Sequence, residues 1–100
     1  MRWATVIPIT AVAACAQDLS TDNFGHPFEP WVPRDVRAFV IDAQGCMHFS
    51  GESGEGMPER QAYIDKMMRK ACTNIDVRKR VLMERHKSPQ IRQTISDAWD

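Results

Sequence analysis

The three cysteines of this 100-residue chain constrain its fold more than any other feature. Cys15 lies at the end of an apolar amino-terminal stretch, whereas Cys46 and Cys72 lie in the body of the chain. If the apolar stretch exports the protein, we expect a Cys46–Cys72 disulfide, because an unpaired thiol is a liability in an oxidising compartment. Closing that loop would remove unfolded-state entropy worth roughly 3.5 kcal/mol. The alternative is a cytosolic protein with two buried free thiols.

The first 14 residues have the features of a signal segment. One positive charge at Arg2 is followed by twelve residues without a charged side chain, WATVIPITAVAA. This run is too short to cross a bilayer but suits the apolar region of an export signal. We therefore predict a signal segment over residues 1–14. A second interpretation is an apolar amino-terminal helix of a cytosolic protein, which Pro8 would interrupt.

The end of this segment, Val12-Ala13-Ala14-Cys15, resembles the lipobox of bacterial lipoproteins. The resemblance implies that Cys15 is lipidated, becomes the new amino terminus and anchors a protein that faces the periplasm. Because Ala16 rather than aspartate follows the cysteine, the resemblance also implies the outer membrane as the destination. The competing prediction is cleavage by ordinary signal peptidase after the Ala14-Cys15-Ala16 pattern, which would release a soluble periplasmic protein.

The stretch that follows has the composition of a linker. Its sequence, QDLSTDNFGHPFEPWVP, covers residues 17–33 and contains three prolines and several turn-forming residues. We predict a lipidated, extended tether over residues 15–33, with Phe28 and Trp31 lying against the domain that follows. That domain covers residues 34–100.

Four segments of this domain show the apolar spacing of helices and the residues that typically begin and end them. The first begins near Pro33 and is predicted to end at Gly45, so that Cys46 lies just past its end. Residues 47–56 contain three glycines and are predicted to form a loop. The apolar stripe of the first helix consists of Val36, Phe39, Val40 and Ala43.

The remaining three segments complete a helical bundle. The second helix opens at Pro58 and carries Cys72 at its carboxyl end on an apolar face. A break at residues 73–74 precedes a third, basic segment, and the serine-proline pair at residues 88–89 starts the fourth. No strand is expected. The predicted fold is all-α, a short bundle of three to four helices stapled by one disulfide, after a signal segment and an extended tether.

The charges of the chain balance, with 13 basic and 13 acidic residues, so no global field would attract nucleic acid. One stretch is locally basic: residues 66–87 hold eight lysines and arginines against two acidic residues. Solvated helix faces explain this run most simply. The alternative is a patch for an acidic partner or for lipid head groups.

The densest group of chemically capable side chains is CMHFSGE, residues 46–52. In a functional interpretation His48 titrates or binds a ligand, Glu52 orients it, and Phe49 packs the loop on the bundle. These three residues are our candidate binding residues. In the structural alternative, His48 hydrogen-bonds to loop backbone and Glu52 accepts backbone N–H groups at a turn.

This stretch resembles a Cys-x-His-Phe-x-Gly-Glu element that follows the first helix in a family of small uncharacterised exported proteins of proteobacteria. The resemblance covers about residues 34–95 and includes the later cysteine and the serine-proline helix start. It implies a helical architecture and an envelope address, and it implies no reaction.

The sequence shows neither a catalytic set nor a metal-ligand pattern. It contains no G-x-S-x-G element, and both cysteines of the domain are expected in a disulfide. The available ligands have no known ligand spacing; they are His26, His48, His86, Glu52 and Glu55. We therefore expect no enzymatic activity, no cofactor and no bound metal.

Two functional hypotheses follow. The first is a small binding or interaction protein anchored in the envelope, of which an inhibitor or immunity-type lipoprotein is one version. Its partners would be the membrane, through the lipid anchor, and another envelope protein, with no nucleic acid. The alternative is a small periplasmic metal-handling protein that uses His48 and Glu52 together with His86. A purely structural envelope component is a third interpretation.

Overall fold

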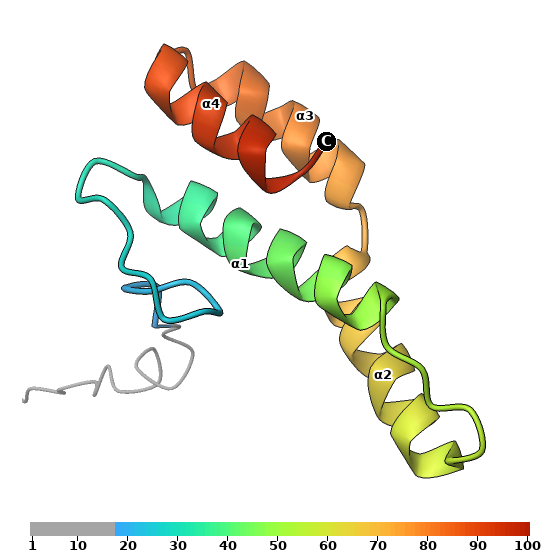
Figure 1. The fold of residues 1–100 in the computed structure, drawn as a ribbon. Coiled ribbons are helices and arrows are strands. Elements are labelled where there is room, and N and C mark those ends of the chain that lie inside the picture. The colour runs from blue at the N-terminus through green and yellow to red at the C-terminus, as the bar shows by residue number, and fades with distance from the viewer. Residues whose placement is uncertain (1–17) are drawn as a thin grey trace, which may run out of the picture.

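The computed structural model describes residues 18–100 as a small helical protein (Figure 1). The helices in this range are α1 (Arg34–Ser50), α2 (Pro58–Cys72), α3 (Ile75–Arg85) and α4 (Pro89–Ala98). A disulfide joins Cys46 to Cys72, with 4.9 Å between their Cα atoms. The predicted all-α fold and the predicted disulfide are therefore confirmed. The signal segment over residues 1–14 and the lipidation candidate Cys15 lie outside the described residues.

Local sequence explains where three of the helices begin. Pro58 and Pro89 occupy the first turns of α2 and α4, where a fixed φ suits the helix and a missing N–H costs nothing. Asn74 has a φ of 55°, a left-handed conformation that ends α2 and sets the direction of α3. None of the helices within residues 18–100 is long and apolar enough to span a membrane.

The hydrophobic core lies where α1 meets α3 and α4. The stripe predicted on α1 is buried, and Val36 and Phe39 have no exposed surface. Ile75 and Leu82 of α3 and Ile95 of α4 complete the cluster. Burying a side chain of this kind contributes about 2–3 kcal/mol. This cluster is thus the largest hydrophobic contribution to stability among the described residues.

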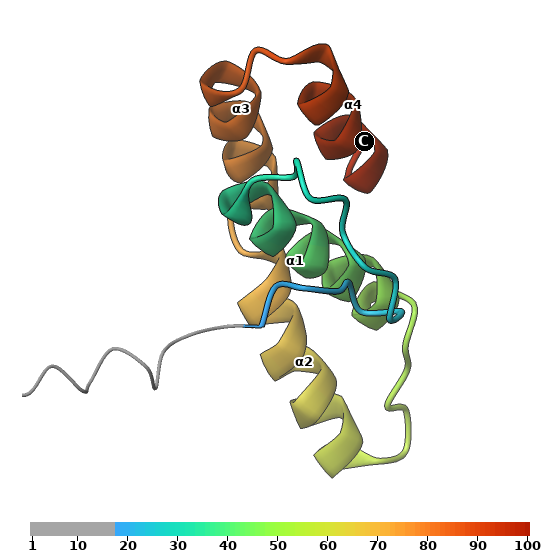
Figure 2. The same ribbon diagram turned by 90° about the vertical axis from the view of Figure 1, so that its left-hand side faces the viewer.

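Helix α2 packs on the other end of α1. Figure 2 shows α2 extending away from α3 and α4, and its main helix contact is with α1. Its buried side chains are Ile64 and Ala71. Because Cys72 is the last residue of α2, the disulfide fixes this helix to α1 at one end only.

The prediction that the first helix ends at Gly45 is wrong. Helix α1 continues to Ser50, so part of the predicted loop over residues 47–56 is helical, and Cys46 lies inside the helix. A glycine in a helix interior costs about 1 kcal/mol relative to alanine. That cost is a weak local preference, and the packing of α1 against α2 beside the disulfide outweighs it. Space does not require a glycine here, because a Cβ at position 45 would lie 3.5 Å from the Ala71 Cβ, an ordinary van der Waals distance.

Residues 18–33, the described part of the predicted tether, pack along α1 (Figure 1). Leu19 and Val32 are buried. The guanidinium group of Arg37 on α1 donates to three backbone carbonyls, those of Leu19 at 3.0 Å, Glu29 at 3.1 Å and Val32 at 2.8 Å. These contacts make the segment part of the folded unit.

The two aromatic residues expected to lie against the helices differ in burial. Phe28 packs against the core cluster, and the Arg37 guanidinium lies 5.4 Å from the centroid of its ring. Trp31 keeps 39% of its surface exposed. The prediction is confirmed for Phe28, whereas Trp31 lies at the margin of the packed surface.

Candidate functional site

A cleft of about 320 Å³ lies between α1, α2 and the turn at residues 22–26. Its walls are mainly apolar, and each of the three elements supplies part of them. The apolar side chains that line it are Phe24, Ile41, Phe49, Met67 and Ala71. This volume is at the lower end of the range of small-molecule sites in proteins.

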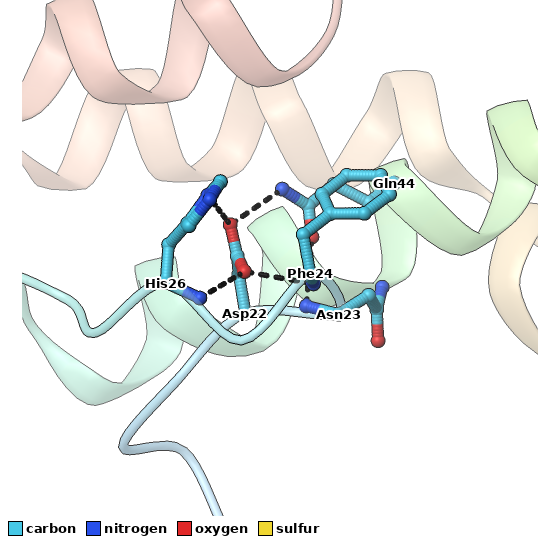
Figure 3. Close-up of polar contacts among 5 residues, drawn as sticks. All are labelled: Asp22, Asn23, Phe24, His26 and Gln44. Atoms are coloured by element: carbon cyan, nitrogen blue, oxygen red, sulfur yellow. Dashed lines mark hydrogen bonds and ion pairs between the residues drawn. The ribbon is translucent and has the colours of Figure 1, made fainter.

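The turn at residues 22–26 is fixed to α1 through Asp22 (Figure 3). One carboxylate oxygen of Asp22 accepts the backbone N–H groups of Phe24 and His26, both at 2.9 Å. The other oxygen accepts the side-chain amide of Gln44 on α1 at 3.0 Å. Gly25 closes the turn with a φ of 82°, which a residue without a Cβ adopts at no steric cost.

Asn23 joins the same turn to α1 by two further hydrogen bonds. Its backbone N–H donates to the side-chain oxygen of Gln44 at 3.1 Å. Its side-chain amide donates to the backbone carbonyl of Ile41 at 2.7 Å. Both Asp22 and Asn23 therefore hold the turn on α1.

The surroundings of Asp22 lower the pKa of its carboxyl group. Desolvation by itself would raise this pKa, but the hydrogen bonds from Gln44 and from the backbone of His26 and Phe24 outweigh it. The charge of the His26 imidazole, 3.6 Å away, contributes a smaller lowering. Asp22 is thus ionised at neutral pH and keeps its full capacity to accept hydrogen bonds.

Phe24 is presented to solvent by this turn. The residue is 67% exposed although it lines the cleft. A single exposed aromatic side chain is ordinary on a protein surface, but here the backbone on both sides of it is held by hydrogen bonds (Figure 3). Because the backbone around Phe24 is already held, a ligand that covers the ring has to order only its side chain.

Two of the three predicted binding residues, His48 and Phe49, line this cleft from the last turn of α1. The exposed His48 ring meets the Phe49 ring edge-on, with 4.9 Å between centroids. Phe49 in turn meets Tyr63 of α2 edge-on at 5.9 Å. A row of aromatic rings therefore crosses from α1 to α2 beside the cleft.

Glu52, the third predicted residue, is not part of the cleft lining. Its carboxylate pairs with Arg60 of α2, and its backbone N–H donates to the carbonyl of Phe49 at 3.1 Å. Among the described contacts it forms no bond with His48. The structure thus brings His48 and Phe49 together and places Glu52 in the loop that joins the two helices.

The charged residues of the cleft differ in how they are paired. Asp42 forms an ion pair with Arg78 of α3, with 2.8 Å between nitrogen and oxygen. Lys70 of α2 also lines the cleft, and within residues 18–100 it forms no ion pair or hydrogen bond. The one unneutralised formal charge of the lining is therefore positive.

His86 and His48, two of the histidines considered as metal ligands, lie far apart. His86 contacts Asp35 near the start of α1, with 3.0 Å between Nε2 and the carboxylate. His48 follows about thirteen residues further along α1, which corresponds to roughly 20 Å. His26 lies in the turn beside Asp22. Among residues 18–100, no group of three or more His, Cys, Asp or Glu side chains is arranged to hold a metal ion.

Much of the cleft lining was not predicted from the sequence. Asn23 and Phe24 belong to the segment predicted as a tether, and Lys70 was one of many charges on the basic helix faces. The available signal was the unusual number of aromatic residues in a proline-containing, polar segment. No local sequence pattern indicates which helix that segment packs against.

Comparisons with protein-family models, with curated proteins and with solved structures found no match. The resemblance to small exported proteins of proteobacteria stays a prediction. Function is therefore inferred from the geometry of the chain itself.

Proposed function

We propose that this protein is an exported binding module of the bacterial cell envelope, which holds its partner in the cleft between α1, α2 and residues 22–26. The observation that carries the proposal is Phe24, an exposed aromatic ring held by a hydrogen-bonded turn at the edge of an apolar cleft. Aromatic side chains are frequent anchors of binding interfaces. An inhibitor or immunity-type lipoprotein is one version of this role.

The envelope address is supported by the sulfur chemistry of the chain. The Cys46–Cys72 disulfide is of a kind that persists in oxidising compartments and is rare in the cytosol. Residues 1–14 have the composition of a signal segment. We propose lipidation at Cys15 and an outer-membrane location facing the periplasm, with a soluble periplasmic protein as the alternative.

The packing of residues 18–33 refines how such an anchor would act. Leu19 is buried, so the folded domain begins close to Asp18. Only three residue steps separate Cys15 from Asp18. That stretch of chain spans at most about 10 Å. A lipidated Cys15 would therefore hold the domain at the membrane surface, where its partner would be another envelope protein.

We propose binding rather than catalysis because of the surroundings of His48. Its ring contacts Phe49 and has, among the described residues, no acid or nucleophile within hydrogen-bonding distance. In nucleophilic catalysis the histidine base is hydrogen-bonded to a nucleophile and oriented by a third group. The cleft therefore offers contact surface more than a reacting group.

A photo-cross-linking experiment in cells tests the binding role. Replacing Phe24 by p-benzoylphenylalanine places the cross-linker at the cleft, and the same replacement at Val77, 47% exposed on α3, is the control. We expect one discrete adduct from position 24, identified by mass spectrometry as an envelope protein, and none from position 77. Equal adducts from both positions, or none from position 24, would refute the proposal.

The address has a separate measurement. The intact mass of the protein in the membrane fraction should show a diacylglyceryl adduct on Cys15. Recovery of a soluble protein that begins at Gln17 would instead indicate a periplasmic protein without a lipid anchor. Free thiols at both Cys46 and Cys72 in protein taken from cells would contradict an oxidising address altogether.

A further inference from the structure

The polar groups of the cleft lining are mostly committed to other parts of the protein. Asp42 is neutralised by Arg78. The side-chain amide of Gln44 donates a hydrogen bond to Asp22 and accepts one from the backbone N–H of Asn23. The side-chain amide of Asn23 donates to a backbone carbonyl. These groups hold the walls of the cleft together, so their hydrogen bonds are made within the protein and not with a ligand.

Two polar side chains of the lining remain available to a ligand. Lys70 and His48 form no hydrogen bond or ion pair within residues 18–100. Lys70 donates hydrogen bonds and carries a positive charge. With Asp42 neutralised, a ligand in the cleft meets a positive charge and no uncompensated negative one. The polar end of a matching ligand is therefore an anion.

The walls define the other end of the ligand. Phe24, Ile41, Phe49 and Met67 present aromatic and alkyl carbon to a space of about 320 Å³. Such a space suits one aromatic or branched aliphatic side chain with its adjoining polar group. A helix of a partner protein would need a longer groove.

We infer that the cleft binds the carboxy-terminal residue of a polypeptide when that residue is apolar. Its side chain lies between Phe24, Phe49 and Met67, and its terminal carboxylate faces Lys70. This inference deepens the proposed function and rests on it, because it names the part of the partner that the cleft recognises.

A chain terminus fits these charges better than a free amino acid does. A free amino acid carries an ammonium group next to its carboxylate, and Lys70 would repel it. In a polypeptide that nitrogen is a neutral amide.

Peptide titration tests the inference. The oxidised protein purified from cells would be titrated with N-acetyl-Gly-Gly-Phe and with the same peptide amidated at its carboxyl terminus, and amide shifts followed by NMR. We expect a dissociation constant on the order of 1 mM or below, with shifts centred on residues 23–24, 48–49 and 67–71. The acid should bind roughly threefold to fivefold more tightly than the amide, as an exposed ion pair allows. Free phenylalanine should bind more weakly than the acid.

Matched variants separate charge from packing. Lys70→Gln should weaken the acid about threefold to fivefold and leave the amide unchanged. Lys66→Gln removes the same charge from α2 one turn earlier, outside the lining, and should change neither. Phe24→Ala should weaken both peptides about tenfold, because it removes apolar contact and leaves Lys70 in place.

Three outcomes would overturn the inference. These are equal binding of acid and amide, equal effects of Lys66→Gln and Lys70→Gln, and no shift in the cleft at about 10 mM peptide. Cross-linking from position 24 then separates the two proposals. A specific envelope adduct from that position would leave the binding role standing with a different ligand, whereas its absence would remove both.

Discussion

The two ends of α1 are stabilised by different means. Around its amino-terminal half, α3 and α4 bury Phe39 and Ile95 in a continuous apolar cluster. Around its carboxyl-terminal half, α2 buries two side chains, and a disulfide holds the helix pair. We call these regions the core end and the cleft end of the protein. One relies on hydrophobic burial and the other mainly on a covalent bond.

The difference shows how a small protein keeps a binding surface. A covalent bond stabilises the cleft end without burying its aromatic residues, so Phe24 and Tyr63 remain exposed. At the core end the same kind of side chain is used for stability. Ligand-binding segments are usually drawn from the less stable parts of a protein.

The largest expected effect is at the core end. Phe39→Ala should lower the free energy of unfolding by about 4 kcal/mol, because it removes a fully buried ring and leaves a cavity. Denaturant titration measures this loss. Phe49→Ala at the cleft end, where the ring is half-buried, should cost clearly less. Equal losses would mean that the two ends share one core.

Removing the disulfide should affect the cleft end first. The paired change Cys46→Ser and Cys72→Ser should cost about 3 kcal/mol. In hydrogen exchange, the amides of α2 should lose protection while those of α3 and α4 keep most of theirs. Wild-type protein treated with a reductant should behave in the same way. Simultaneous loss of protection in all four helices would contradict the division into two ends.

A glycine pair tests how tightly the loop packs on α2. A Cβ at Gly54 would lie 2.6 Å from the backbone nitrogen of Gln61, so Gly54→Ala must displace backbone. We expect a loss of about 1–3 kcal/mol in denaturant titration. At Gly51 the nearest atom to an added Cβ is 3.7 Å away. Gly51→Ala is therefore the control and should change stability little. A similar change of stability in both variants would mean that the close approach of Gly54 to α2 does not cause the loss.

The smallest expected effect is electrostatic and lies at the core end. Desolvation would raise the pKa of Asp35, but hydrogen bonds from Arg85 and His86 and the charge of His86 lower it overall. A carboxyl pKa that is lower in the folded state stabilises the fold above the unfolded pKa, near 4, and this contribution is lost as the pH falls through the folded value.

Asp35→Asn should remove this contribution. Because the Asp35 side chain is 33% exposed, the loss at pH 7 should not exceed about 1 kcal/mol. The difference from wild type should shrink as the pH falls below about 4. Denaturant titrations at pH 7 and at low pH measure it. A difference that persists unchanged at low pH would mean that the effect is not due to the charge.

Much of the fold could be predicted from the sequence. The apolar stripe on α1, the prolines that open α2 and α4 and the break at residues 73–74 are local features, and each lies where it was expected. The end of α1 was predicted wrongly because Gly45 was treated as a local helix terminator. The helix instead continues past Gly45, where α1 packs on Ala71 of α2, which lies 26 residues further along the chain.

The candidate site was predictable only in part. His48 and Phe49 stood out by residue type, and they line the cleft. Phe24 and Lys70 did not, because their role depends on which helix each one faces. Glu52 was grouped with His48 by closeness in sequence, yet its carboxylate pairs with Arg60 of α2.

The sequence by itself determined the helices and the cysteine pairing, because helix periodicity, proline geometry and the count of domain cysteines act over short distances or by elimination. Only the tertiary structure decided that residues 18–33 lie along α1 and that a cleft forms beside α2. Those outcomes depend on single long-range contacts, such as the one between Gln44 and Asp22. A hydrogen bond between residues 22 positions apart leaves no periodic trace in a sequence.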